Sequence, residues 1–200
     1  GPCLAQALDP TGHGDINNYL VDVTYHNPTL AKDIDIKTVF SYTDVNTSSE
    51  QRLFPPGAIL PIGADGNIDP VSGVPVVFTD GLRGNPAIYE SHIRMDLSMF
   101  YTGIEKHRVR TGAGVLNAKV RAEEEKNFGP GVLENPAPFT VVDGSLTDVS
   151  GTPYAFFTSD ERDVYYLSLQ DEWYLASDWD LTAGIRYDNY SDFGDTINPR

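Results

Sequence analysis

The residues best suited to chemistry are charged side chains that alternate along one short segment of the chain. Glu90, His92, Arg94 and Asp96 occupy every second position. In a β-strand this spacing places all four on one face, with successive members about 7 Å apart. Imidazole and carboxylate groups bind metal ions, but this separation is too wide for them to share one ion. We therefore expect a charge-paired ladder on a wet surface and no metal site.

Three arginines contribute positive charge to this ladder, two of them from a neighbouring segment. Arg94, Arg108 and Arg110 carry charge opposite to that of Glu90 and Asp96. Opposite charges that face each other on adjacent strands attract. We therefore expect these arginines to pair with Glu90 and Asp96 across strands.

No other chemistry is indicated by the sequence. It contains no glycine-rich phosphate-binding motif, no nucleophile elbow and no cysteine–histidine arrangement. Cys3 is the single cysteine, so an internal disulfide is excluded. We expect no catalytic residues, no metal, no cofactor and no enzymatic activity.

The charge balance excludes nucleic acid as a partner. The 200 residues include 14 basic and 29 acidic side chains, which gives a formal net charge of −15. Proteins that bind a polyanion present clustered lysine and arginine instead. The acidic excess is typical of a solvated surface.

Alternation of apolar and polar residues is the main structural signal. Between residues 89 and 101 the odd positions are mostly apolar and the even positions are mostly polar or charged. A helix would scatter these charges around its circumference, whereas a strand separates them onto two faces. The segment is long enough to cross a bilayer as a tilted strand.

The same alternation recurs along the chain and predicts six strands. They lie near 17–25, 33–43, 87–101, 106–118, 163–176 and 179–190. Asp171 is the one charged residue on the apolar side of the fifth strand. A seventh strand is expected to begin at Thr196 and to be cut off at Arg200.

The connections differ strongly in length. Short turns are expected from Asn27 to Asp33, at Thr102–Lys106 and at Ala176–Asp178, whereas residues 43–86 and 117–162 form two long polar stretches. Short turns at one edge and long loops at the other are the layout of an outer-membrane barrel. Tyr101, Trp173 and Trp179 border the short turns, where aromatic rings favour a membrane interface.

Several segments resemble strands of the TonB-dependent outer-membrane receptors. They are Tyr166-Leu167-Ser168-Leu169-Gln170-Asp171-Glu172-Trp173, Trp179-Asp180-Leu181-Thr182-Ala183-Gly184-Ile185-Arg186-Tyr187-Asp188, Asn198-Pro199-Arg200, Tyr101-Thr102-Gly103 and Arg110-Thr111-Gly112-Ala113-Gly114. The resemblance covers about half of the chain. It implies an all-β, antiparallel up-and-down meander that is part of a transmembrane β-barrel with long extracellular loops.

The resemblance also implies a function. Such a receptor imports a scarce extracellular ligand, such as an iron-siderophore complex, haem or cobalamin, across the outer membrane of a Gram-negative bacterium. Residues 43–86 and 117–162 would bind the ligand, the three aromatic residues would lie at the membrane interface, and lipid would surround the barrel. The lumen-facing candidates are Glu90, His92, Arg94, Asp96, Arg108, Arg110, Glu172 and Arg186. We expect a mid-barrel fragment without the plug domain, through which TonB would act.

A soluble β-sandwich or β-barrel that binds a ligand is the alternative. In that fold the apolar strand faces would form a core instead of meeting lipid. The acidic charge favours this reading, whereas the strand lengths, the long loops and the order of the motifs favour the receptor.

Overall fold

The computed structural model describes residues 12–134 and 140–200. Cys3 and residues 135–139 of the second predicted loop lie outside this part of the chain. Among the described residues there is no helix that is long and apolar enough to cross a membrane. The described elements are strands joined by turns.

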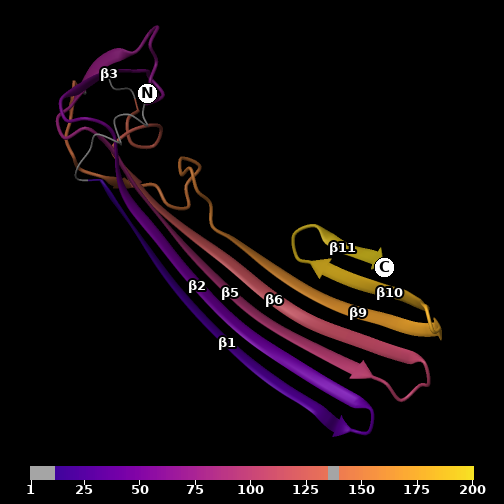
Figure 1. The fold of residues 1–200 in the computed structure, drawn as a ribbon. Helices are drawn as coiled ribbons and strands as arrows, with labels where there is room; N and C mark the ends of the chain where they lie inside the picture. Colours follow the sequence, from indigo (N-terminus) through magenta and orange to yellow (C-terminus); the bar gives the residue numbers. More distant parts are fainter. Residues whose placement is uncertain (1–11, 135–139) are drawn as a thin grey trace. The chain divides into compact units, whose positions relative to one another are not determined.

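The main sheet is an up-and-down meander (Figure 1). Its seven principal strands follow one another in the order β1, β2, β5, β6, β9, β10 and β11. Their bounds are β1 His13–Ala31, β2 Ile34–Phe54, β5 Leu82–Tyr101, β6 His107–Lys126, β9 Asp160–Ala176, β10 Trp179–Tyr190 and β11 Gly194–Pro199. A short strand, β8 Thr147–Asp148, pairs with the end of β6. Within the described residues, β1 and β11 are the edge strands of this sheet.

Several strands are longer than the alternation predicts. All seven principal strands overlap the predicted ranges, β11 with the strand expected from Thr196, but β2 continues to Phe54 and β6 continues to Lys126. The predicted loop starts at residues 43 and 117 are therefore wrong. Both extensions are rich in polar residues, such as the Ser48-Ser49-Glu50 segment, so no apolar face marks them. In these extensions the strands continue to pair through their backbones although they have no apolar face.

A second, smaller sheet lies within the predicted loops. It consists of β3 Ala58–Ile62, β4 Val74–Phe78 and β7 Val141–Val142. β3 pairs antiparallel with β4, and β4 pairs in parallel with β7. The sequence did not indicate these three short strands, because the surrounding glycine and proline residues are typical of loops.

The described residues divide into two compact units. Unit 1 takes its members from residues 1–17, 45–89 and 120–159, and unit 2 takes them from 18–44, 90–119 and 160–200. Unit 1 contains the small sheet and a core cluster of five buried apolar residues. These are Ile62, Val76, Phe78, Leu82 and Leu133.

Unit 2 has no comparable core. All of the buried apolar side chains in the described part of the chain belong to unit 1. In unit 2, large apolar side chains such as Ile93, Leu167 and Ile185 are exposed instead. The two units therefore use apolar residues differently: unit 1 buries them, and unit 2 presents them on one face of its strands.

Replacement of Ile62 by valine is expected to lower the stability of unit 1 by about 1 kcal/mol, because it removes one buried methylene group. Ile62 is 1% exposed, whereas Ile59 on the same strand is 64% exposed. Ile59→Val is therefore the matched control, with little expected change. Hydrogen exchange of the β3 and β4 amides measures the difference; equal effects of both variants would contradict the assigned core.

Candidate functional site

A network of polar side chains crosses four strands of unit 2. Arg94 donates to Asp96 through Nε and Nη2, at 2.5 and 3.2 Å. The Tyr166 hydroxyl donates to Asp96 Oδ1 at 2.5 Å, the same oxygen that accepts from Arg94 Nη2. The Arg186 guanidinium lies 3.9 Å from the centre of the Tyr166 ring. We call these residues, together with Asp188, the charged ladder.

Asp188 anchors the far end of the charged ladder. Arg186 donates to both of its carboxylate oxygens, at distances of 2.6–2.9 Å. Asn198 of β11 donates to Asp188 Oδ2 at 3.4 Å. Bidentate arginine–carboxylate pairs fix both position and orientation. The Arg186 side chain is therefore held in place over the Tyr166 ring.

A glycine allows Tyr166 to reach Asp96. These two residues lie on β9 and β5, with β6 between them. At Gly114 of β6, an added Cβ would lie 2.3 Å from Tyr166 Cε1 and 2.8 Å from Asp96 Oδ1. No side chain fits in this space, so the tyrosine can cross β6 only where that strand carries glycine.

The observed ion pairs differ from the cross-strand pairs that the sequence predicted for the arginines. Arg94 pairs with Asp96 on its own strand, because a long arginine side chain spans two residues and Tyr166 occupies the cross-strand position. Arg108 pairs with Glu172, at 3.8 Å, and not with Glu90 or Asp96. Arg108 and Arg110 both lie against the Phe100 ring, about 5 Å from its centre.

The predicted residues are thus only partly brought together. Arg94, Asp96 and Arg186 meet in the charged ladder, and Arg108 meets Glu172. Glu90 and His92 lie on β5 outside these contacts. The sequence did not identify the residues that complete the network, although they lie on the polar faces of their strands. They are Tyr166, Asp188 and Asn198.

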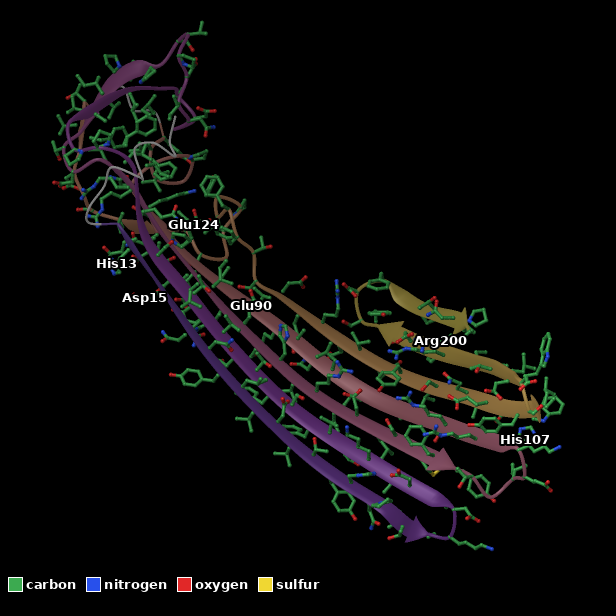
Figure 2. All side chains as sticks on the ribbon, viewed as in Figure 1. His13, Asp15, Glu90, His107, Glu124 and Arg200 are labelled. Carbon is green, nitrogen blue, oxygen red and sulfur yellow. The ribbon has the colours of Figure 1, made fainter. Side chains whose placement is uncertain are left out.

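On the other face of the strands, which carries mainly apolar residues at odd-numbered positions, His107 forms a cluster beside the short turns (Figure 2). Its Nδ1 lies 2.6 Å from Asp171 Oδ2, and its ring stacks on Trp173 with the centroids 5.3 Å apart. This pairing accounts for Asp171, the charged residue on an otherwise apolar strand face. Tyr101 ends β5 and Trp179 begins β10, so the predicted interface aromatics all lie at or near strand ends.

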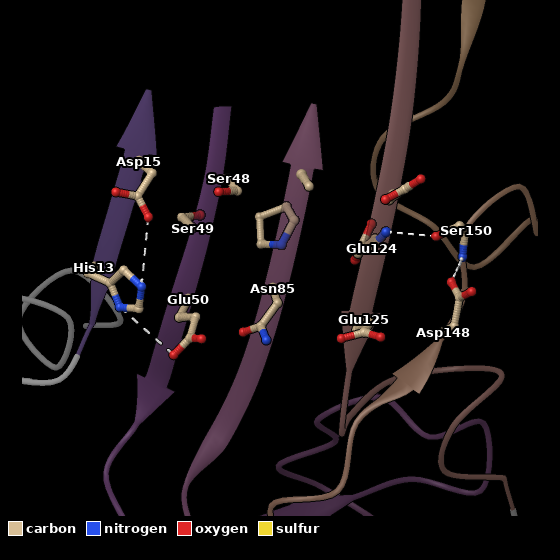
Figure 3. A pocket seen from close by; sticks show the side chains of 13 residues that line it. His13, Asp15, Ser48, Ser49, Glu50, Asn85, Glu124, Glu125, Asp148 and Ser150 are labelled. Atoms are coloured by element: carbon tan, nitrogen blue, oxygen red, sulfur yellow. Dashed lines mark hydrogen bonds and ion pairs between the residues drawn. The ribbon is translucent and has the colours of Figure 1, made fainter. Parts of the chain in front are cut away.

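Unit 1 contains a polar cavity of about 450 Å³ among its strand ends (Figure 3). His13 lies between Asp15 and Glu50, 3.9 Å from a carboxylate oxygen of each. The lining residues with side-chain oxygens or carboxylates are Asp15, Ser48, Ser49, Glu50, Asn85, Glu123, Glu124, Glu125, Asp148 and Ser150. Within the described part of the chain, no three histidine, cysteine or acidic residues form a group that could hold a metal ion.

A turn stabilises the negative charge at one side of this cavity. The Ser150 backbone N–H donates to Asp148 Oδ1 at 2.9 Å. Hydrogen bonds from the side chain and backbone of Ser150 hold the pKa of Asp148 below its usual range. Asp148 is therefore ionised at neutral pH, and the cavity favours cationic or hydrogen-bond-donating groups.

Buried polar residues attach the segment after β8 to the end of β6. Lys126 is 1% exposed and donates to the Tyr154 carbonyl at 2.6 Å. Its Nζ lies 3.6 Å from Glu124 Oε1 and 4.2 Å from the centre of the Phe156 ring. Glu124, 4% exposed, accepts the Phe156 backbone N–H at 2.6 Å. This segment is thus held by hydrogen bonds, an ion pair and a cation–π contact.

Comparison with known proteins identifies one match. Residues 5–200 match the family model described as TonB dependent receptor-like, beta-barrel. Searches of curated proteins and of solved structures found no match.

Proposed function

Because the chain belongs to the TonB-dependent receptors and matches their β-barrel domain, we propose that it forms part of the wall of a receptor that imports a scarce nutrient. The family has a receptor and transport role in the outer membrane of Gram-negative bacteria. The match over residues 5–200 is the observation that carries this proposal. The proposed cargo is an iron-siderophore complex, haem or cobalamin.

The two faces of unit 2 support a position between lipid and water. On one face, large apolar side chains such as Leu167, Leu169 and Ile185 are exposed. A continuous exposed apolar surface needs a non-aqueous neighbour, and lipid provides one. A soluble β-sandwich would instead bury this face, but the buried apolar side chains of the described chain all lie in unit 1.

In this proposal the polar strand faces line the lumen. Lumen residues are Glu90, His92, Arg94, Asp96, Arg108, Arg110, Glu172 and Arg186. The aromatic residues Tyr101, Trp173 and Trp179 mark the interface at the short-turn edge, where their amphipathic rings are favoured. TonB would act through a plug domain inside the barrel.

Ligand recognition is assigned to the segments between the long strands of unit 1. With the strand bounds corrected, these are residues 55–81 and 127–159. The small sheet and its core support the described part of these segments, and the polar cavity, lined mostly by residues of the long strands, includes Asp148 and Ser150 of the second segment. Binding residues on a rigid support lose little conformational entropy when a ligand arrives.

Deletion of the receptor gene from its host is expected to abolish uptake of one cargo class under nutrient limitation. Uptake of radiolabelled iron-siderophore, haem and cobalamin would be measured in the deletion strain and in a strain that lacks TonB. The wild-type gene supplied on a plasmid is the control and should restore uptake. Wild-type uptake of all three cargoes in the deletion strain would contradict the proposed cargo, and uptake that persists without TonB would contradict the proposed energy coupling.

A further inference from the structure

Three arginines surround a small cavity in unit 2. Arg110, Arg186 and Arg200 line a space of about 100 Å³ (Arg200 is labelled in Figure 2). Ligand sites for whole small molecules are several times larger. The cavity therefore matches a single functional group. We call it the arginine pocket; its polar lining is completed by Ser98, Tyr166, Ser168 and Gln170.

Strand register brings these groups together. Ser168 is directly opposite Arg186, and Gln170 is directly opposite Gly184. Gly184 also exchanges two backbone hydrogen bonds with Arg200, at 2.8 and 2.9 Å. The pocket is therefore lined by two adjacent rows of residues, each row made of residues that lie opposite one another on neighbouring strands.

Glycine keeps the floor of the pocket open. Gly112 of β6 lines it, and an added Cβ there would lie 2.7 Å from Ser168 Oγ. The small residue leaves room for the Ser168 hydroxyl, which donates to the Gly112 backbone carbonyl at 3.4 Å.

The charge of the pocket is incompletely balanced. Arg186 is paired with Asp188, whose negative charge also attracts Arg200, but none of the ion pairs formed among the described residues includes Arg110 or Arg200. Arg110 lies against the Phe100 ring at 5.2 Å, a contact that orients the guanidinium and leaves its charge without an anionic partner. This excess of positive charge occurs in a chain with a net charge of −15.

We propose that the arginine pocket binds a carboxylate group, held by Arg110 and Arg200. Planar guanidinium groups match the geometry of a carboxylate and bind it through paired hydrogen bonds. The proposal rests on the proposed function, in which this face lines the lumen. The carboxylate belongs either to a ligand that passes through the lumen or to an acidic side chain of a plug domain.

The test uses the full receptor in lipid nanodiscs, with and without its plug domain, and with ¹³C-labelled arginine guanidinium groups. Acetate is titrated against chloride at constant ionic strength, and the arginine signals are followed by NMR. Arg110→Gln is expected to weaken acetate binding about tenfold, since it removes a charged donor. Arg162→Gln is the matched control; Arg162 pairs with Asp192 away from the pocket, and acetate binding should not change.

The outcomes separate the two sources of carboxylate. Binding in the receptor that retains its plug identifies the site as one for a free ligand. Binding only without the plug identifies an acidic plug side chain as the natural occupant. Absence of binding in both forms, or equal affinity of the Arg110→Gln and Arg162→Gln receptors, would overturn the proposal. Because the measurement is equilibrium binding, its failure is distinct from a failure of nutrient import in cells.

Discussion

Replacement of Lys126 by methionine is expected to release the segment of residues 149–157 from β6, at a cost of about 3–5 kcal/mol in local stability. The substitution leaves the buried Glu124 carboxylate without its cationic partner and the Tyr154 carbonyl without its donor. Loss of one partner from a buried ion pair is costly, because the remaining charge stays desolvated. Hydrogen exchange of the amides between Val149 and Phe157 measures the effect.

A second lysine provides the control for this prediction. Lys119 pairs with Glu161 at 3.7 Å, but its side chain is 58% exposed. Such a surface pair contributes less than about 1 kcal/mol, so Lys119→Met should leave hydrogen exchange nearly unchanged. The double variant Lys126→Met with Glu124→Gln should be less destabilised than Lys126→Met alone, because glutamine still accepts the Phe156 N–H and carries no charge. Equal protection in the Lys126→Met and Lys119→Met receptors would refute the assigned role.

Replacement of Gly114 by alanine is expected to destabilise unit 2 by about 3 kcal/mol. The new methyl group would overlap the Tyr166 ring, which would have to move away from Asp96 and Arg186. Overpacking costs about 1–3 kcal/mol, and a lost hydrogen bond to a carboxylate adds about 1.5–3 kcal/mol. Denaturant unfolding of the receptor in detergent, followed by tryptophan fluorescence, measures the change.

Gly84→Ala is the matched control for this substitution. An added Cβ at Gly84 has its nearest neighbour at 3.5 Å, which is ordinary van der Waals contact. This variant should fold with nearly wild-type stability. If Tyr166 is the cause, Gly114→Ala should cost little more in a Tyr166→Leu background than Tyr166→Leu does alone. Additive costs in the double variant would disprove the proposed overlap.

The sequence predicts the sheet best where its residues have two chemically different faces. Alternation between residues 89 and 101 falls within β5, and the Trp179–Asp188 segment falls within β10. Prediction from alternation fails at residues 43–54 and 119–126, where both faces of the strands carry polar residues. The small sheet was missed for a related reason, since β3 and β4 have five residues each and lie among glycine and proline.

The sequence predicted which residues of the candidate site lie on the polar faces of their strands, but it did not predict which of these residues are in contact. Arg94, Asp96 and Arg186 were identified because they share the polar parity of their strands. Their contacts depend on Tyr166 crossing β6 at Gly114, and no sequence pattern relates two residues that are 52 positions apart along the chain and adjacent only in the sheet. The sequence likewise did not explain the charged Asp171 on an apolar strand face, because its partner His107 lies 64 positions away along the chain.

The exposed apolar side chains of β1 have a consequence for the biogenesis of the receptor. Nearly all of its 19 residues are exposed, including the apolar side chains of Tyr19, Val21, Val23 and Tyr25. Large exposed apolar surfaces favour association with other molecules when no lipid covers them. On the way to its proposed place in the outer membrane this face of β1 has no lipid to cover it, so we expect the new chain to require a holdase chaperone until membrane insertion.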